Sequence, residues 1–432
     1  MKQSMWMATL TFAAAVGVTG AGASRDGSST ALGISGRANA TPTIAAADRF
    51  VTVVWGASLP AGATDVYSAV SRDGGRTFAP PVRVNDVEGS ASLGGEQPPH
   101  VSLVRRAGRE PAVVVVWTAK SKDGTRLLMA RSEDGGASFG HAAPIEGGVA
   151  KGNRGWESTT VDREGHVVAV WLDHRETAAP SSSPTRHEGH DHSKMNMPKA
   201  DGAERAQLSK LYFARVDDPA SAKAITGGVC YCCKTSVAAG PDGAIYAAWR
   251  HVYPGNIRDI AFTLSRDGGR TFSAPLRVSD DGWALDGCPE NGPTLAVGTG
   301  GAVHIVWPTL VAGSTADGEP SLALFHAATT DGRHFSPRAR LPVRGTPRHP
   351  QIVMKADGSF VIAWDEELDG GRRRVVAVSA AQQGSTLRFT PMTINDSARS
   401  EYPVVAVAAD ATLIAWASGD AGQSVVRVQR IP

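Results

Sequence analysis

The chain has 432 residues, with 44 Lys and Arg against 42 Asp and Glu, and its formal net charge is +2. This near balance gives no reason to expect nucleic acid or an anionic membrane surface as a partner. The 48 Gly and 26 Pro indicate a turn-rich chain, which suits many short strands better than helices.

The first 23 residues have the features of a secretory signal peptide. Lys2 precedes an apolar stretch that ends in small residues, and we expect cleavage after Ala23. No later segment is long and apolar enough to span a bilayer. We therefore expect a mature, monomeric protein that is periplasmic or secreted, where cysteines are oxidised or bind metal.

The mature chain is organised by a repeating unit that is marked by a tryptophan. Each unit has up to four short apolar runs separated by Gly, Pro and Asp, and the second run ends in Trp, which is typical of a propeller blade. The markers are Trp55, Trp117, Trp171, Trp249, Trp307, Trp364 and Trp416. They predict an all-β fold over residues 24–432, a single β-propeller of four-stranded antiparallel blades, with seven blades preferred and six as the alternative.

The last unit has only three apolar runs. The run at 31–34, near the other terminus, precedes the first unit as a fourth strand precedes the next blade elsewhere in the chain. We expect this N-terminal strand to complete the last blade, because closing the ring leaves no exposed sheet edge.

The third unit is lengthened by a polar insert after Trp171. Residues 176–207 are rich in Ser, Pro and charge and show no apolar period, which indicates a mobile loop. The insert contains His187, His190, His192, Met195 and Met197. His and Met together favour copper in both oxidation states, and the alternative is a solvated loop that binds metal only adventitiously.

An eight-residue motif, Ser-x-Asp-x-Gly-x-x-Phe, occurs between the third and fourth runs of three units, at 71–78, 132–139 and 265–272, with a shorter copy at 329–335. It resembles the Asp-box, or bacterial neuraminidase repeat, of sialidase-like β-propellers. The resemblance implies the same fold for nearly the whole mature chain. Because the Asp of such a box accepts backbone hydrogen bonds in a tight turn, the motif says little about function.

Propeller strand order places the segment before each first strand, and the segment after each Trp, on one face. Cys230 and Cys288 are 58 residues apart, as are Trp249 and Trp307, so the two cysteines occupy equivalent positions in neighbouring blades. The same counting gathers polar side chains at this mouth of the central channel: Glu96, His100, Arg154, Glu157, Asp173, His174, Arg175, Arg250, His251, Glu290, Arg348, His349, Asp365, Glu366 and Glu401.

All four cysteines of the chain are expected at this mouth: Cys230, Cys232, Cys233 and Cys288. Thiolates select Cu(I) or Zn(II), and His174 or His251 could complete the ligand shell. The alternative is a disulfide from Cys288 to one of the other three, and the sequence does not choose among the pairings. We expect an exported protein that binds or handles a soft metal, copper in preference to zinc, with a periplasmic protein as a further partner.

The resemblance to sialidases implies a different activity, exo-sialidase-type glycoside hydrolysis. Sialidases hold the substrate carboxylate with three arginines and use a Tyr–Glu pair as nucleophile. The matching candidates are Arg154, Arg250, Arg348, Glu401 and Tyr402. The arginine motif expected before the first strand is absent, since residues 39–42 are Asn-Ala-Thr-Pro. The sequence therefore favours metal binding over hydrolysis, and a non-catalytic interaction scaffold with a disulfide between blades is the third interpretation.

Overall fold

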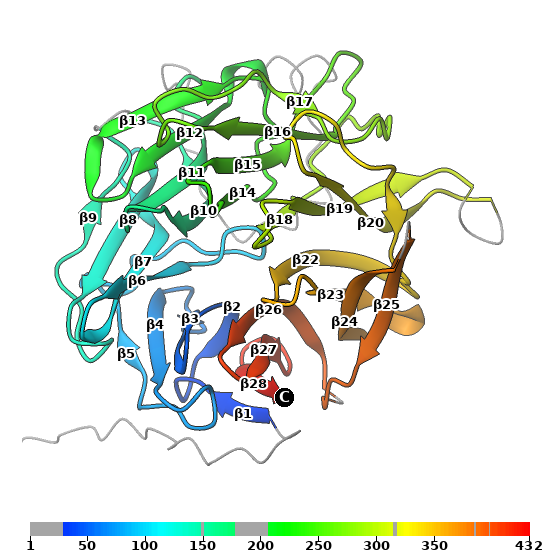
Figure 1. Cartoon of the computed structure of the whole chain (residues 1–432). Coiled ribbons are helices and arrows are strands. Elements are labelled where there is room, and N and C mark those ends of the chain that lie inside the picture. Colours follow the sequence, from blue (N-terminus) through cyan, green and yellow to red (C-terminus); the bar gives the residue numbers. More distant parts are fainter. Residues whose placement is uncertain (1–28, 148–150, 178–205, 314–317, 384–385, 397) are drawn as a thin grey trace, which may run out of the picture.

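The computed structural model describes residues 29–147, 151–177, 206–313, 318–383, 386–396 and 398–432. The expected signal peptide and the loop ligands His187, His190, His192, Met195 and Met197 lie outside these residues. In the part that is described, the strands form seven four-stranded antiparallel sheets around a common axis (Figure 1). The seven-bladed propeller is confirmed, and the six-bladed alternative is wrong.

Each blade consists of four strands, and the first strands of neighbouring blades contact one another around the axis. The first three blades are β2 (Ala38–Ala47), β3 (Phe50–Ser58), β4 (Thr64–Ser71) and β5 (Val82–Arg83); β6 (His100–Arg106), β7 (Arg109–Ser121), β8 (Gly124–Ser132) and β9 (Ala143–Pro144); and β10 (Arg154–Val161), β11 (Val167–Asp173), β12 (Lys210–Arg215) and β13 (Asp218–Thr226).

The next three blades follow the same order, and a 3₁₀ turn, η2 (Asp369–Gly371), joins the second and third strands of the sixth. These blades are β14 (Ser236–Ala239), β15 (Ile245–Arg250), β16 (Ile260–Ser265) and β17 (Leu276–Arg277); β18 (Thr294–Val297), β19 (Val303–Val311), β20 (Ser321–Thr329) and β21 (Ala339–Arg340); and β22 (Thr346–Met354), β23 (Phe360–Glu367), β24 (Arg373–Gln383) and β25 (Thr386–Met392). No helix among the described residues has the length and apolar character needed to cross a membrane.

The seventh blade joins the two ends of the chain. It contains β26 (Ser400–Ala408), β27 (Ala411–Ser418), β28 (Val425–Ile431) and β1 (Ser29–Leu32), and β1 lies beside β28 in Figure 1. This confirms the predicted closure, although the strand begins two residues earlier than expected. Residues 33–37 form a turn instead, because the Asn39 side chain accepts a hydrogen bond from the Ile34 backbone N–H at 2.9 Å.

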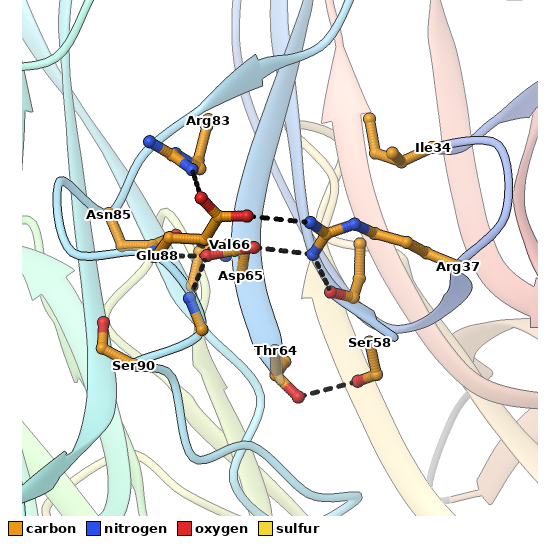
Figure 2. A network of polar contacts seen from close by, with 12 residues as sticks. Ile34, Arg37, Ser58, Thr64, Asp65, Val66, Arg83, Asn85, Glu88 and Ser90 are labelled. Carbon is orange, nitrogen blue, oxygen red and sulfur yellow. Dashed lines mark hydrogen bonds and ion pairs between the residues drawn. The ribbon is translucent and has the colours of Figure 1, made fainter. Parts of the chain in front are cut away.

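A partly buried ion pair joins this junction to the first blade. Arg37, just after the closing strand, donates to Asp65 Oδ2 at 2.6 Å and also to the carbonyl of Ala57 (Figure 2). Burial by itself raises the pKa of Asp65, but hydrogen bonds from Asn85, Gly89 and Arg37 outweigh it and lower the pKa below its ordinary value. The carboxylate is therefore held in its charged form where the two ends of the chain meet.

The seven marker tryptophans form the core of the ring. Their side chains, on the second strand of each blade, are all 0% exposed. Trp55, for example, belongs to a cluster with Leu413 and Ala415 of the preceding blade, so it packs across the junction between sheets. Burying an aromatic side chain of this size contributes about 4–6 kcal/mol of transfer free energy. The tryptophan thus recurs in the sequence because the packing between neighbouring blades recurs in the fold.

The predicted Asp motifs form the turns between the third and fourth strands, on the face opposite the mouth. Asp267 Oδ1 accepts a hydrogen bond from the Thr271 backbone N–H at 2.8 Å, and Asp134 accepts one from Ser138 at 3.0 Å. Gly269 has φ 83°, and a Cβ at this position would lie 2.2 Å from the ring of Phe213 in the preceding blade. These aspartates therefore have a structural role in the turns.

Candidate functional site

Three segments that precede first strands meet the first strand of the sixth blade near the axis. Glu96 Oε2 accepts hydrogen bonds from the backbone N–H groups of Lys234, at 2.9 Å, and Gly292, at 2.7 Å. Lys234 Nζ in turn donates to the carbonyl of Pro350 at 2.8 Å. These contacts join the second, fourth, fifth and sixth blades. Glu96 and Lys234 are both buried; burial lowers the pKa of Lys234, and the nearby charge of Glu96 opposes this shift.

Three cysteines are gathered by a tight turn just before β14. The Cys230 N–H donates to the carbonyl of Arg250 at 2.9 Å, which fixes the start of the turn against the end of β15. The Sγ atoms of Cys230, Cys232 and Cys233 then lie 3.7, 3.8 and 3.9 Å apart. All three side chains are buried, at 1%, 6% and 1% exposure. The result is a nearly equilateral triangle of sulfur atoms without direct access to solvent.

The fourth cysteine is bonded to this triangle. Cys232 and Cys288 form a disulfide, with Cα atoms 6.2 Å apart, between the segments that precede the fourth and fifth blades. Cys230 and Cys233 remain free thiols. Unlike the other three cysteines, Cys288 is exposed. The structure therefore contains both features that the sequence left as alternatives, a compact group of sulfurs and a disulfide between blades.

The pKa values of the two free thiols are shifted in opposite directions. Burial raises the pKa of Cys230, but the hydrogen bond from Cys233 and the charges of Arg258 and Arg250 outweigh it, so the pKa falls to about 6. Burial and the hydrogen bond to Cys230 raise the pKa of Cys233 instead. Arg258 Nη1 donates to Cys230 Sγ at 3.1 Å. At neutral pH the pair is thus a thiolate on Cys230 that accepts a hydrogen bond from the Cys233 thiol.

Arg258 is the partner that the sequence did not reveal. It is 0% exposed, and its Nε donates to the carbonyl of Leu285 at 2.9 Å, in the segment that carries Cys288. The guanidinium therefore bridges that segment and the Cys230 sulfur. In the sequence it is one arginine among many, 28 residues from Cys230, and no motif marks it.

The histidines predicted to complete the ligand shell have partners of their own. His174 Nδ1 lies 3.1 Å from Ser209 Oγ, and its ring packs against Trp156 and Tyr231. His251 Nδ1 accepts a hydrogen bond from Trp249 Nε1 at 3.3 Å, and burial lowers its pKa to about 4. Neither belongs to the group of ligand atoms within 4.8 Å of one another at the mouth, which comprises Cys230, Cys232 and Cys233. Ligation by these histidines stays a prediction.

A second such group lies on the opposite face. Asp162, Glu164 and His166, in the hairpin between β10 and β11, have ligand atoms within 4.8 Å of one another. The His166 Nδ1 to Asp162 Oδ2 distance is 3.4 Å, which is compatible with an ordinary ion pair. The sequence analysis did not single out this Asp-x-Glu-x-His run, which resembles the many polar hairpins of the chain.

Two of the arginines implied by the sialidase resemblance form hydrogen bonds or ion pairs with other groups of the protein. Arg250 donates to three backbone carbonyls, those of Asn291, Arg258 and Pro308. Arg154 donates to the carbonyl of Gly152 and lies 3.5 Å from Asp173. Such engagement does not favour a role for Arg250 or Arg154 in holding a substrate carboxylate.

The proposed nucleophile pair has similar surroundings. Glu401 is paired with Arg373 at 2.7 Å. Tyr402 packs against His349, with ring centroids 4.6 Å apart, and burial raises its pKa to about 12. A cavity of about 440 Å³ between the sixth and seventh blades contains four arginines in its lining, but none of the five sialidase candidates. Glu401 contacts this cavity through Arg373, which belongs to its lining.

No protein-family model matches the chain, and no curated protein is significantly similar to it in sequence. Solved structures do resemble it. The polysaccharide lyase Uly1 has a TM-score of 0.51 at 10% identity, over 90% of each chain. An α-L-arabinanase of Penicillium chrysogenum has a TM-score of 0.48 at 12% identity, over 91% of this chain and 93% of its own.

The Hadza microbial sialidase Hz136 has a TM-score of 0.46 at 14% identity, over 86% of this chain and 73% of its own. At such identities a structural likeness reports the fold alone, because one fold supports many activities. The chain has a seven-bladed β-propeller fold, and its function must be argued from its own residues.

Proposed function

We propose that the protein binds a soft metal ion between the sulfur atoms of Cys230, Cys232 and Cys233 in their reduced form, and that it prefers Cu(I) to Zn(II). The observation that carries the proposal is the size of the triangle, with sides of 3.7, 3.8 and 3.9 Å. A point equidistant from the three atoms is about 2.2 Å from each, close to the ~2.3 Å of a zinc–thiolate bond. The same sulfur ligands also suit Cu(I).

The charge around the site favours a monovalent ion. Three thiolates and one Cu(I) would carry a net charge of −2, whereas Zn(II) would leave −1. The two buried guanidiniums of Arg250 and Arg258 supply +2, and the nearby Glu96 and Lys234 offset each other. Because buried charge is costly unless it is paired, this balance supports Cu(I).

The proposed role is metal binding or handling after export, not hydrolysis. Export rests on the sequence of residues 1–23, and the resulting location would be the periplasm or the exterior. The insert with His187 and Met195 would bind copper more weakly and exchange it faster, which would raise its concentration near the mouth. A periplasmic protein that delivers or accepts the ion would be the partner.

A second candidate function is supported by the Cys232–Cys288 disulfide itself. A covalent link between two blades suits a rigid, non-catalytic scaffold that binds other proteins. The two candidates differ in what the reduced protein does. A scaffold needs only the disulfide, whereas a metal site needs the thiolates of Cys230 and Cys233. Glycoside hydrolysis has only the fold in its favour.

The test is Cu(I) affinity of the reduced, folded protein, measured anaerobically by competition with the chromogenic chelator bathocuproine disulfonate. We expect one tight equivalent that is lost in Cys230→Ser and in Cys233→Ser. Met129→Leu is the matched control, because this methionine lies on β8 of the second blade, away from the cluster. Equal Cu(I) binding by wild type and both serine variants would contradict the proposal. The scaffold would then be the remaining candidate function.

A further inference from the structure

The two sulfurs of the disulfide face different surroundings. Cys232 is 6% exposed and lies against Cys230 and Cys233, whereas Cys288 is exposed. An external thiol can therefore approach the disulfide from the Cys288 side. Thiol–disulfide exchange depends on which sulfur is accessible to attack and on which thiolate leaves.

We propose that Cys288 is a redox switch for the buried sulfur cluster, and that an external dithiol opens the site through it. The inference rests on the proposed function, because what the switch controls is the soft-cation site. A thiolate of the dithiol attacks Cys288 Sγ. A bond forms between these two sulfurs, the Cys232–Cys288 bond breaks, and the electron pair leaves on Cys232 as a thiolate.

The second thiol of the reductant completes the reaction. It loses its proton to solvent and attacks the first reductant sulfur, which releases Cys288 as a thiolate that takes up a proton. The reductant leaves as a cyclic disulfide, so two electrons have passed to the pair Cys232 and Cys288. The product is a complete three-sulfur triangle, since Cys232 is now a free ligand.

The product thiolate is formed where a cation is needed. Cys232 Sγ lies 3.8 Å from Cys230 Sγ, which accepts a hydrogen bond from Arg258 Nη1 at 3.1 Å. In the oxidised protein Cys232 is bonded to Cys288 and offers no thiolate to a cation. Cu(I) bound between the three sulfurs stabilises the reduced form. Reduction and metal binding should therefore promote each other, as thermodynamic linkage requires.

The geometry also makes the switch reversible. The segment that carries Cys288 is held on both sides by contacts that do not involve the disulfide. Leu285 N–H donates to the carbonyl of Asn256 at 3.1 Å, and Asn291 N–H donates to Cys233 Sγ at 3.4 Å. Cys288 should therefore stay close to Cys232 after reduction, ready to form the bond again when the metal leaves and an oxidant is present.

The first experiment measures bathocuproine-competed Cu(I) binding by full-length wild type and by Cys288→Ser, each oxidised and each reduced with dithiothreitol that is then removed. We expect wild type to bind tightly only when reduced, and Cys288→Ser to bind equally tightly in both conditions. Thermal melting checks that the variant is folded, and reduced wild type is the folded reference without the disulfide.

The outcomes separate the two proposals. If neither reduced wild type nor Cys288→Ser binds Cu(I), the proposed function fails. If oxidised and reduced wild type bind equally, the function stands and the switch is wrong. A Cys288→Ser variant that binds only after reduction also overturns the switch.

The second experiment identifies the sulfur that is attacked. Oxidised Cys230→Ser/Cys233→Ser protein, which has no internal thiol to rearrange the bond, is pulsed with glutathione, quenched in acid and mapped by mass spectrometry. Glutathione on Cys288 supports the switch, and glutathione on Cys232 contradicts it. In wild type, free Cu(I) at a thousandfold excess over its dissociation constant should raise the reduction potential by about 90 mV, at 29.6 mV per tenfold change. An unchanged potential would refute the coupling.

Discussion

Replacing Arg258 by Gln should make Cys230 a weaker acid. In the native protein the Arg258 Nη1 to Cys230 Sγ distance is 3.1 Å, and the pKa of Cys230 is lowered from 9.0 to about 6. A hydrogen bond from a charged donor contributes about 1.5–3 kcal/mol, and one pKa unit corresponds to about 1.36 kcal/mol. Loss of the guanidinium should therefore raise the pKa by about 1–2 units, because Arg250 and the Cys233 hydrogen bond remain.

The assay is the thiolate absorbance near 240 nm of the oxidised protein as a function of pH. Cys232 and Cys288 are then in the disulfide and the pKa of Cys233 is raised, so the titration step at lowest pH belongs to Cys230. We expect a midpoint of about 6 in wild type. Arg258→Lys keeps the charge and is the matched control, with a smaller upward shift than Arg258→Gln.

The same change alters how stability depends on pH. Because the pKa of Cys230 is lower in the folded protein than its ordinary value of 9.0, ionisation stabilises the fold fully above pH 9.0, and this stability is lost as pH falls through about 6. In Arg258→Gln the loss should be complete at a higher pH. A titration midpoint in a folded Arg258→Gln variant that equals that of wild type would refute the assignment of Arg258 as a stabiliser of the thiolate.

Three further predictions follow from the fold and from the missing arginine motif. Arg37→Ala should lower the free energy of unfolding in urea by about 1.5–3 kcal/mol, because buried Asp65 loses its charged hydrogen-bond donor, while loss of the exposed Arg105 should have no measurable effect. Gly269→Ala should lower the melting temperature, since its Cβ would overlap the preceding blade at a positive φ; an unchanged melting curve would contradict this packing. A fluorogenic sialoside should not be hydrolysed, and turnover that disappears in Glu401→Ala would show that the site is catalytic.

The repeat of strands and turns is determined by local sequence, and this is why the fold could be predicted. Trp249 and Trp307 mark equivalent second strands because the second strand of each blade buries a tryptophan at the same position. The closing strand was predictable for a similar reason, since a three-stranded last unit would expose a sheet edge. Its position shifted by two residues because a single side chain, Asn39, holds the turn that follows it.

The chemistry of the mouth was only partly predictable. Equal spacing of 58 residues placed Cys230 and Cys288 in equivalent positions, but equivalence in the repeat did not decide which sulfurs are bonded. The partner of Cys288 is Cys232, because the turn before β14 directs that side chain toward the next blade. Spacing identifies which residues share a face, whereas bonding depends on side-chain directions within a few ångströms.

The electrostatics of the site depend on tertiary structure alone. Glu96 contacts the backbone of Lys234, 138 residues away, and Arg258, between β15 and β16, contacts Cys230, 28 residues away. Such contacts join segments that are remote in sequence, and their strength comes from burial, which no local pattern encodes. The sequence determined that thiols would gather at one face of a propeller. Only the folded chain decided which thiol is ionised, which is oxidised and which is exposed, because these properties depend on the distances and burial of groups brought together from different blades.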